Sequence, residues 1–318
     1  MSESRWGRAL VGVMVVAGLG AACGAEFDPY FQVKALRVMA IGADKPSVGP
    51  GEQTTLEPFV FEPGGAPLTY KWSWCPFSTG STTGYACAVE EEDLAGLGLP
   101  SFDLGTGPTA VFAYPDPPQI VPLVCEQLTQ GELPDFFSAP DCERGIPILI
   151  RVEITGAGQT LTAVRELELL VGPEVVPNLN PSVGPMRAIP IGGTEADAIE
   201  LGEDVPAVLE RDTDYAILMD IPADSSETFL RVQAGAPPKE SPEILVVSWF
   251  VEEGDLENER TGFIDGESTL FDAGRNVWRT PTIDALASSE TRLFAVLRDE
   301  RGGVDWLERR IVLVPQTP

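Results

Sequence analysis

Tyr70-Lys71-Trp72-Ser73-Trp74 and Val247-Ser248-Trp249-Phe250-Val251 are two stretches of the same kind, one in each half of the chain. In each of them, apolar or aromatic residues recur at every second position around a tryptophan. Side chains alternate between the two faces of a β-strand, so this spacing predicts a strand with one buried face. A buried tryptophan on a central strand is typical of a β-sandwich. The two stretches therefore predict an all-β chain with one sandwich in each half.

The rest of both halves is predicted to form short strands that are separated by Gly, Pro and Asp turns. Phe112-Ala113-Tyr114-Pro115 corresponds loosely to 277–281, and each half ends in a long hairpin with a glycine-containing turn. A repeat of about 150 residues indicates two copies of one sandwich and not a solenoid. The strands are expected over residues 33–41, 54–61, 68–74, 109–114, 146–154, 160–171, 215–221, 244–251, 262–264, 276–280, 291–298 and 304–314.

The chain has 318 residues, which is about the length of two ordinary domains. Four prolines at intervals of four residues, from Pro173 to Pro185, interrupt it near the middle. We expect a first domain over 33–172, a linker over 173–185 and a second domain over 186–318. The segments before them are predicted to be a signal peptide (1–22) and a short lipidated tether (23–32).

The strand that carries a central tryptophan is followed, in the second half, by a strand that ends in Arg298-Asp299-Glu300-Arg301-Gly302-Gly303. This pattern resembles tandem immunoglobulin-like or PKD-like (polycystic kidney disease repeat) domains, as they recur in lipoproteins and surface proteins of myxobacteria-like species. The WDFGDG-type signature of PKD domains is missing, so the resemblance is to immunoglobulin-like domains in the broad sense. The resemblance implies adhesion, spacing or scaffolding, by analogy of fold alone.

The N-terminus has the three parts of an export signal. Arg5 and Arg8 precede an apolar run over 9–19, and small residues follow over 20–22. The run is too short to span a bilayer, which takes about 20 residues. Cys23, directly after the small residues, resembles the acylated cysteine of the bacterial lipobox, although the leucine stands four residues before it and not three. Simple secretion with an ordinary thiol at Cys23 is the alternative.

Acylation of Cys23 implies attachment to the lipid bilayer of the cell envelope. Gly24 follows the cysteine where the inner-membrane retention signal usually has Asp, which favours the outer membrane. About ten residues separate Cys23 from the first expected strand and reach at most ~35 Å when extended. We therefore expect the first domain to lie close to the bilayer.

Histidine is absent from the sequence, and the formal net charge is −28. The absence of histidine excludes Ser-His-Asp and Cys-His catalysis and the HExxH metalloprotease motif. A surface this acidic repels nucleic acid and anionic headgroups, so neither is expected as a partner. A carboxylate-based hydrolase is the remaining enzymatic alternative, but a chain with 49 acidic residues offers many accidental pairs. We expect the protein not to be an enzyme.

The other four cysteines form an even set in an exported chain, which predicts two disulfides. Of the three possible pairings we favour Cys75–Cys87 with Cys125–Cys142, because each bridge then closes a loop of under twenty residues within one long insertion. Each would add roughly 3 kcal/mol in the chain-entropy model. A zinc site is the alternative, but the chain has no CxxC unit.

Trp74, next to the Cys75 loop, is the candidate for an exposed aromatic residue that stacks on a sugar. The alternative for the row Tyr70, Trp72 and Trp74 is burial in the core, which we expect for Trp72 and Trp249. Asp299 and Asp305 are weak calcium candidates, because calcium takes six to eight oxygen ligands. A turn-capping role for Asp299 is the alternative. The remaining acidic groups, 90–93 and Asp212 with Asp214, are expected to be solvated.

These observations predict a membrane-anchored lipoprotein that displays β-sandwiches in a structural, scaffolding or adhesion role. The alternative is a module that binds polysaccharide or another ligand through the loops at 75–104 and 116–145. No cofactor is expected apart from possible Ca²⁺, and the expected partners are the bilayer, through Cys23, and an envelope protein or polysaccharide.

Overall fold

The two tryptophan stretches form strands β4 (Thr69–Cys75) and β15 (Leu245–Val251) in this computed structural model. Trp72 and Trp249 are both fully buried. Their indole N–H groups donate to the Gly107 carbonyl (2.9 Å) and the Thr261 hydroxyl (2.8 Å), so the burial leaves no indole donor unpaired. The predicted core role of both residues is confirmed. The structure describes residues 29–94, 99–129, 145–231, 237, 239–282 and 289–316.

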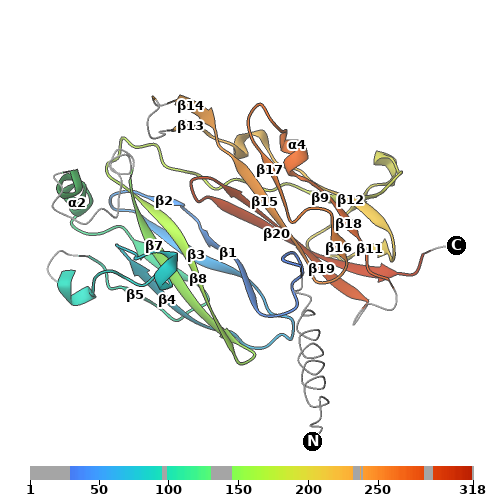
Figure 1. Ribbon diagram of the computed structural model, residues 1–318, viewed down its shortest axis with the longest axis horizontal. Helices are drawn as coiled ribbons and strands as arrows, with labels where there is room; N and C mark the ends of the chain where they lie inside the picture. The colour runs from blue at the N-terminus through green and yellow to red at the C-terminus, as the bar shows by residue number, and fades with distance from the viewer. Residues whose placement is uncertain are drawn as a thin grey trace, which may run out of the picture. The chain divides into compact units, whose positions relative to one another are not determined.

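The first sandwich consists of two sheets that enclose one apolar core (Figure 1). One sheet has the strand order β1-β3-β6 and the other β2-β8-β7-β4-β5. Neighbouring strands are antiparallel, except that β2 runs parallel to β8. The strands are β1 (Arg37–Ala43), β2 (Ser47–Val48), β3 (Gln53–Phe61), β4, β5 (Asp103–Gly105), β6 (Ala110–Ala113), β7 (Gly145–Gly156) and β8 (Gln159–Leu170).

The second sandwich repeats this arrangement around its own core. Its sheets have the orders β10-β9-β12-β18-β16 and β11-β20-β19-β15-β17, and β11 runs parallel to β20. A separate hairpin, β13-β14, stands beside them. The strands are β9 (Met186–Pro190), β10 (Ile199–Glu200), β11 (Ala207–Glu210), β12 (Asp214–Met219), β13 (Thr228–Arg231), β14 (Lys239–Pro242), β15, β16 (Asp255–Leu256), β17 (Arg260–Phe263), β18 (Arg275–Arg279), β19 (Glu290–Asp299) and β20 (Val304–Val314).

The two sandwiches share one strand order. The five strands β2-β8-β7-β4-β5 of the first correspond to β11-β20-β19-β15-β17 of the second, including the single parallel pair at the edge. The three strands β1-β3-β6 correspond likewise to β9-β12-β18. The predicted repeat is therefore present in the topology, and the all-β, immunoglobulin-like fold class is confirmed.

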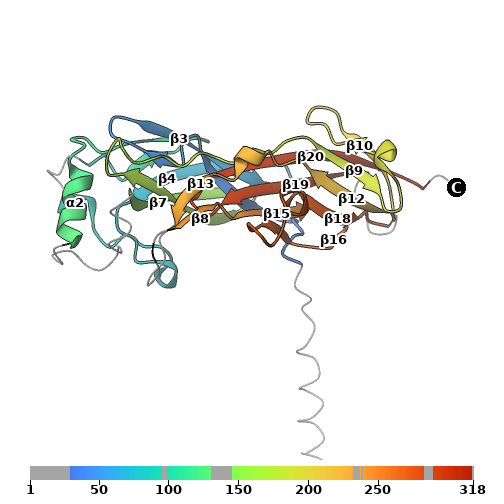
Figure 2. The same cartoon turned by 90° about the horizontal axis from the view of Figure 1, so that it is seen from above.

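Short helices interrupt the strands in both halves. The strand-based prediction missed α2, although Ile120, Val121, Val124 and Cys125 have the spacing of one helical face. Pro122 lies in the first turn, where its missing N–H costs little. Figures 1 and 2 place α2 at the end of the first sandwich remote from the second. The helices are η1 (Ser81–Thr83), η2 (Glu91–Leu94), α2 (Ile120–Thr129), η3 (Glu195–Asp197), η4 (Ala223–Ser225) and α4 (Leu270–Ala273).

The described residues from Phe31 onward belong to one compact unit, which contains both sandwiches. Within the described ranges, no helix has the length and apolar character needed to cross a bilayer. The predicted signal peptide, Cys23 and Gly24 lie outside the described residues.

Candidate functional site: the junction between the sandwiches

The outer face of sheet β1-β3-β6 packs against the outer face of the sheet that contains β15, β19 and β20. On β3, Leu56 points into the core of the first sandwich, whereas Phe59 and Phe61 point outward. Phe294 does the same on β19. Outward residues would be wet in an isolated sandwich, yet Phe61 and Phe294 are each only 1% exposed. Each sandwich therefore buries apolar surface of the other.

Aromatic contacts hold this junction together. Phe294 lies edge-to-face on Phe59 and Phe61, with ring centroids 5.9 and 5.7 Å apart. Trp306 stacks on Phe59 at 5.1 Å. The guanidinium of Arg292, from the second sandwich, lies 4.6 Å from the ring centroid of Phe61. Such pairs add to the stability that apolar burial provides. The remaining buried members of the cluster are Val33, Met39, Ala40, Phe250, Val296 and Val304.

Two asparagines in the predicted linker connect the sandwiches by hydrogen bonds. The Asn180 amide donates to the Ala43 carbonyl (2.7 Å) and accepts from the Val304 N–H (3.0 Å). Asn178 is 1% exposed, and its amide donates to Asp299 at 3.1 Å. Its backbone N–H donates to the Ser47 hydroxyl of the first sandwich. The segment over 173–185 is thus bonded to both sandwiches and does not act as a free hinge at these positions.

Replacing Asn180 with alanine is expected to lower the free energy of unfolding by about 1–3 kcal/mol. The truncation leaves the Ala43 carbonyl and the Val304 N–H at the junction without their present partner. Urea denaturation measures the loss. The control is Leu179→Ala, whose exposed side chain lies in the same segment and whose loss should change the value by under about 0.5 kcal/mol. Equal effects of the two variants would contradict a bridging role for Asn180.

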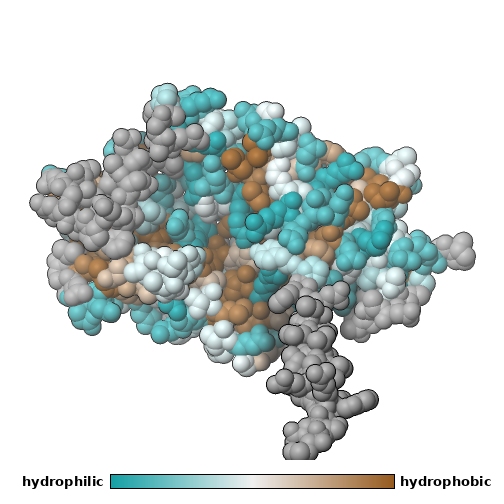
Figure 3. Space-filling model, viewed as in Figure 1, coloured by the Kyte–Doolittle hydropathy of each residue, from teal (hydrophilic) through white to brown (hydrophobic). Residues whose placement is uncertain are grey.

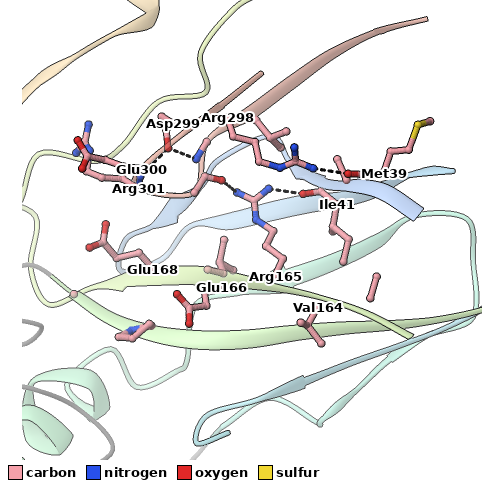
Figure 4. A pocket seen from close by; sticks show the side chains of 18 of the residues that line it. Met39, Ile41, Val164, Arg165, Glu166, Glu168, Arg298, Asp299, Glu300 and Arg301 are labelled. Atoms are coloured by element: carbon pink, nitrogen blue, oxygen red, sulfur yellow. Dashed lines mark hydrogen bonds between the residues drawn. The ribbon is translucent and has the colours of Figure 1, made fainter. Parts of the chain in front are cut away.

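Two arginines reach across the junction to backbone carbonyls. Arg165 on β8 donates to Ile41 O of its own sandwich (2.7 Å) and to Gly302 O in the β19–β20 turn (2.6 Å). Arg298 on β19 donates to Met39 O of β1. Figure 4 shows both guanidinium groups between the strands. Arg165 is 9% exposed, and its burial lowers the pKa of the guanidinium to about 10.

A buried ionic cluster fixes the β19–β20 turn. The Arg301 guanidinium pairs with Glu227 (2.7 Å) and with Glu243, which is 1% exposed. Asp299 accepts the backbone N–H groups of Arg301 (2.8 Å) and Gly303 (2.7 Å). Burial raises the pKa of both the Glu243 and the Asp299 carboxyl groups, although their hydrogen bonds oppose it.

Acidification from about pH 7.5 to about pH 5 is expected to raise the free energy of unfolding. The pKa values of Glu243 and Asp299 are higher in the folded state, so the folded protein binds these protons more tightly than the unfolded chain does. Their contribution to stability is complete below the ordinary carboxyl pKa of about 4 and is lost as the pH rises through the folded values. Partial neutralisation of the −28 net charge acts in the same direction.

Urea denaturation over this pH range measures the effect, and Glu243→Gln should flatten the curve. Below about pH 4 the trend reverses, because groups such as Asp44 and Glu52 have lowered pKa values and lose their bonded ionised form. Stability that falls steadily from pH 7.5 to pH 5 would contradict the assignment of buried, raised carboxyl groups.

The N-terminal end of the compact unit is attached to the second sandwich. Phe31 lies in the second core at 8% exposure, and its carbonyl accepts the Val251 N–H (2.9 Å). The Val33 N–H donates to the Val251 carbonyl (2.9 Å), and Gln32 donates to Gly254 O. Residues 31 and 32, predicted as tether, are therefore packed on the second sandwich. The end of the predicted tether therefore contacts the second sandwich, directly before the first sandwich begins.

A cleft of about 750 Å³ opens at the junction. Its walls are strand β1, strand β8 and the β19–β20 turn, and Phe229 and Arg231 of β13 complete it. Glu166 and Glu168 rise from β8 on one side, and Glu300 and Arg301 face them from the turn (Figure 4). Glu300 is paired with Arg231.

The prediction that Trp74 is an exposed ligand-binding residue is wrong. Trp74 is 2% exposed, its indole N–H donates to Ser101 O (2.8 Å), and Phe102 and Phe112 lie edge-to-face on its ring, each with centroids 5.2 Å away. Ser101 and Phe102, near the end of the 75–104 insertion, lie against the ring and help to cover it. A covered ring has no face for a sugar to stack on, so Trp74 belongs to the core.

The calcium interpretation of Asp299 and Asp305 is also not supported by their surroundings. The Asp299 oxygens point to backbone N–H groups and to Asn178, as a turn-capping carboxylate does. The Asp305 oxygens accept the N–H groups of Val183 (2.9 Å) and Trp306 (2.8 Å). Lone pairs used in this way are not directed at a cation. Across the described ranges, no three acidic or cysteine side chains are grouped as metal ligands.

The Cys75–Cys87 disulfide is confirmed, with the Cα atoms 5.6 Å apart. It closes the loop that contains η1. Cys125 is buried on α2, and its predicted partner Cys142 lies outside the described residues, so the second bridge stays a prediction. The loop over 116–145 is likewise described only in part.

No protein-family model matches the chain, and no curated protein matches it. Among solved structures, it is similar to murine CEACAM1b at 7% identity, over 86% of this chain and 100% of that one, with a TM-score of 0.21. It is also similar to a chimeric titin Z1Z2 at 9% identity, over 89% and 98% of the two chains, with a TM-score of 0.20. These similarities concern the fold alone.

Proposed function

We propose that the protein is a non-enzymatic lipoprotein of the cell envelope, which displays two immunoglobulin-like sandwiches as one rigid unit in a scaffolding or adhesion role. The observation that carries the proposal is the junction. Outward-facing Phe59, Phe61 and Phe294 are buried only because the sandwiches pack on each other. Two sandwiches joined by a flexible linker would expose these sheet faces to solvent. Two sandwiches packed on each other instead keep their outer ends at a constant distance.

The polar groups of the junction support a structural role. Arg165 and Arg298 donate to backbone carbonyls, and Arg301 is paired with two carboxylates. Asp299 caps a turn. These charges are thus engaged in holding the sandwiches together. The face seen in Figure 3 mixes hydrophilic and hydrophobic areas.

Anchoring through Cys23 is the second part of the proposal and rests on the N-terminal sequence. The nine residues from Cys23 to Phe31 span at most ~28 Å when extended. Since Phe31 is packed on the second sandwich and the first begins directly after it, both sandwiches would be held within this reach of the bilayer. Stable anchoring takes more than one acyl chain, as a lipobox cysteine provides.

Metabolic labelling in cells with an alkyne analogue of palmitate tests the anchor. The full chain should incorporate the label and sediment with membranes, and Cys23→Ser should lose both properties. The double variant Cys75→Ser with Cys87→Ser is the matched control, since it removes two other cysteines and should keep the label. Label that persists in Cys23→Ser would refute the anchor and leave the rigid pair of sandwiches unaffected.

A further inference from the structure

Among the residues that the structure describes, strand β8 has one open edge. One edge of β8 pairs with β7 along the whole strand, from the Gly156–Gln159 pair to the Gly145–Leu170 pair. The other edge pairs, within the described ranges, with β2 at Glu168 and Leu169. The hairpin turn at Ala157 and Gly158 makes Gly156 and Gln159 a hydrogen-bonded pair, since both turn residues have positive φ. Backbone groups alternate along a strand, so those of Thr160, Thr162 and Val164 face the open edge.

The second sandwich shows what a covered edge looks like in the same topology. There β11 pairs with β20 over four residues, from Ala207–Ile311 to Glu210–Val314. At the other end of β20, Asn180 accepts the Val304 N–H, and Asp305 accepts the Val183 N–H. Along the corresponding edge of β8, the backbone pairing among the described residues is with the two residues of β2, and an unpaired edge is a template for another strand.

Strand β1, the opposite wall of the cleft, offers a partner strand fewer free backbone groups than β8 does. Strand β1 turns its own edge toward β8, but Arg298 and Arg165 occupy the carbonyls of Met39 and Ile41. The cleft between the strands, lined by Ala163 and Val164 among others, has room for a short peptide at about 750 Å³. The β19–β20 turn closes it at one end, where a Cβ placed on Gly302 would lie 3.8 Å from Glu166 O.

The charge of this edge selects its partner. Glu166 is exposed, and within the described ranges its carboxylate forms no hydrogen bond or ion pair. Glu168 lies beside it on the same face of β8 (Figure 4). A second copy of the chain would bring the same acids and another net charge of −28 to the contact, so self-association is opposed. A strand with basic side chains complements both the backbone and the carboxylates.

We propose that the open edge of β8 binds an extended, basic segment of another protein, which pairs with Thr160–Val164 as an added strand. Its basic side chains face Glu166 and Glu168 at the end of the cleft. This binding site lies beyond the anchoring role and does not depend on acylation of Cys23.

Fluorescence anisotropy with the labelled peptide Ac-Lys-Val-Thr-Val-Lys-Val-Lys-NH₂ tests the proposal on the full chain. Val164→Pro should weaken binding by at least about tenfold, because it removes an N–H that faces the edge and leaves the β7–β8 ladder intact. Val164→Thr keeps the N–H and should bind as the natural chain does. A peptide with N-methyl groups at alternate residues should not bind, which separates strand pairing from mere attraction of opposite charges.

Glu166→Lys is the second variant and lies on the surface, so it should fold normally. This substitution should weaken binding of the basic peptide and strengthen binding of a peptide in which Glu replaces each Lys. No binding to the natural chain, binding that survives Val164→Pro, or no effect of Glu166→Lys would each overturn the proposal. Self-association of the natural chain in sedimentation, abolished by Val164→Pro, would overturn it in favour of a second copy.

Discussion

Replacing Arg301 with alanine is expected to lower the free energy of unfolding by about 3–5 kcal/mol. The Arg301 side chain is 7% exposed and faces Glu243, which is fully buried. Without its partner, the Glu243 carboxylate stays in a low-dielectric site, where an unpaired charge is costly. Guanidinium denaturation, followed by tryptophan fluorescence, measures the loss.

Two comparisons make this result specific. Arg279→Ala removes an arginine of the same sandwich whose pair with Asp214 is solvent-exposed, and it should cost under about 1 kcal/mol. Adding Glu243→Gln to Arg301→Ala should recover part of the stability, because the buried charge is then gone. If Arg301→Ala costs no more than Arg279→Ala, the buried cluster is not as described.

Replacing Phe294 with alanine is expected to cost about 3–5 kcal/mol, the range for a buried phenylalanine. Phe294 lies on the outer face of β19, so its burial depends on Phe59 and Phe61 of the first sandwich. Calorimetry measures the loss and shows whether the sandwiches then unfold in separate steps. Phe271→Ala is the matched control, since that ring is 57% exposed and its loss should change stability by under about 0.5 kcal/mol. A change below about 1 kcal/mol in Phe294→Ala would show that the second sandwich does not depend on the first at this position.

The sandwiches themselves could be predicted from the sequence, because alternation around Trp72 and Trp249 reports the inner face of a strand directly. The Cys75–Cys87 bridge could be predicted as well, because the two cysteines are close in sequence and lie in one loop. In both cases the deciding interactions are local or periodic.

The junction was missed, although one signal for it was present. Leu293-Phe294-Ala295-Val296-Leu297 is apolar at every position, which indicates a strand covered on both faces and not on one. The sequence does not show what covers the second face. That partner is formed by β1 and β3, more than 200 residues earlier in the chain, and contacts of such separation leave no local pattern.

Trp74 and Asp299 show a second limit. Trp74 follows the side-chain alternation of its strand. Whether its ring is exposed to solvent depends on Ser101 and Phe102, which return to it from later in the chain. Asp299 has the composition of a cation ligand, but its partners are backbone N–H groups and Asn178. Burial and hydrogen-bond partners of this kind are set by tertiary structure, so residue type alone left both alternatives open.

A distance distribution between the two sandwiches shows whether they form one rigid unit. Spin labels at Val111→Cys on β6 and Val208→Cys on β11 are suitable, because both side chains are about half exposed and lie in different sandwiches. Double electron–electron resonance, in a Cys23→Ser background, should give a single narrow distribution for the otherwise natural chain. A broad or multi-peaked distribution would show that the two sandwiches move relative to each other and do not form one rigid unit.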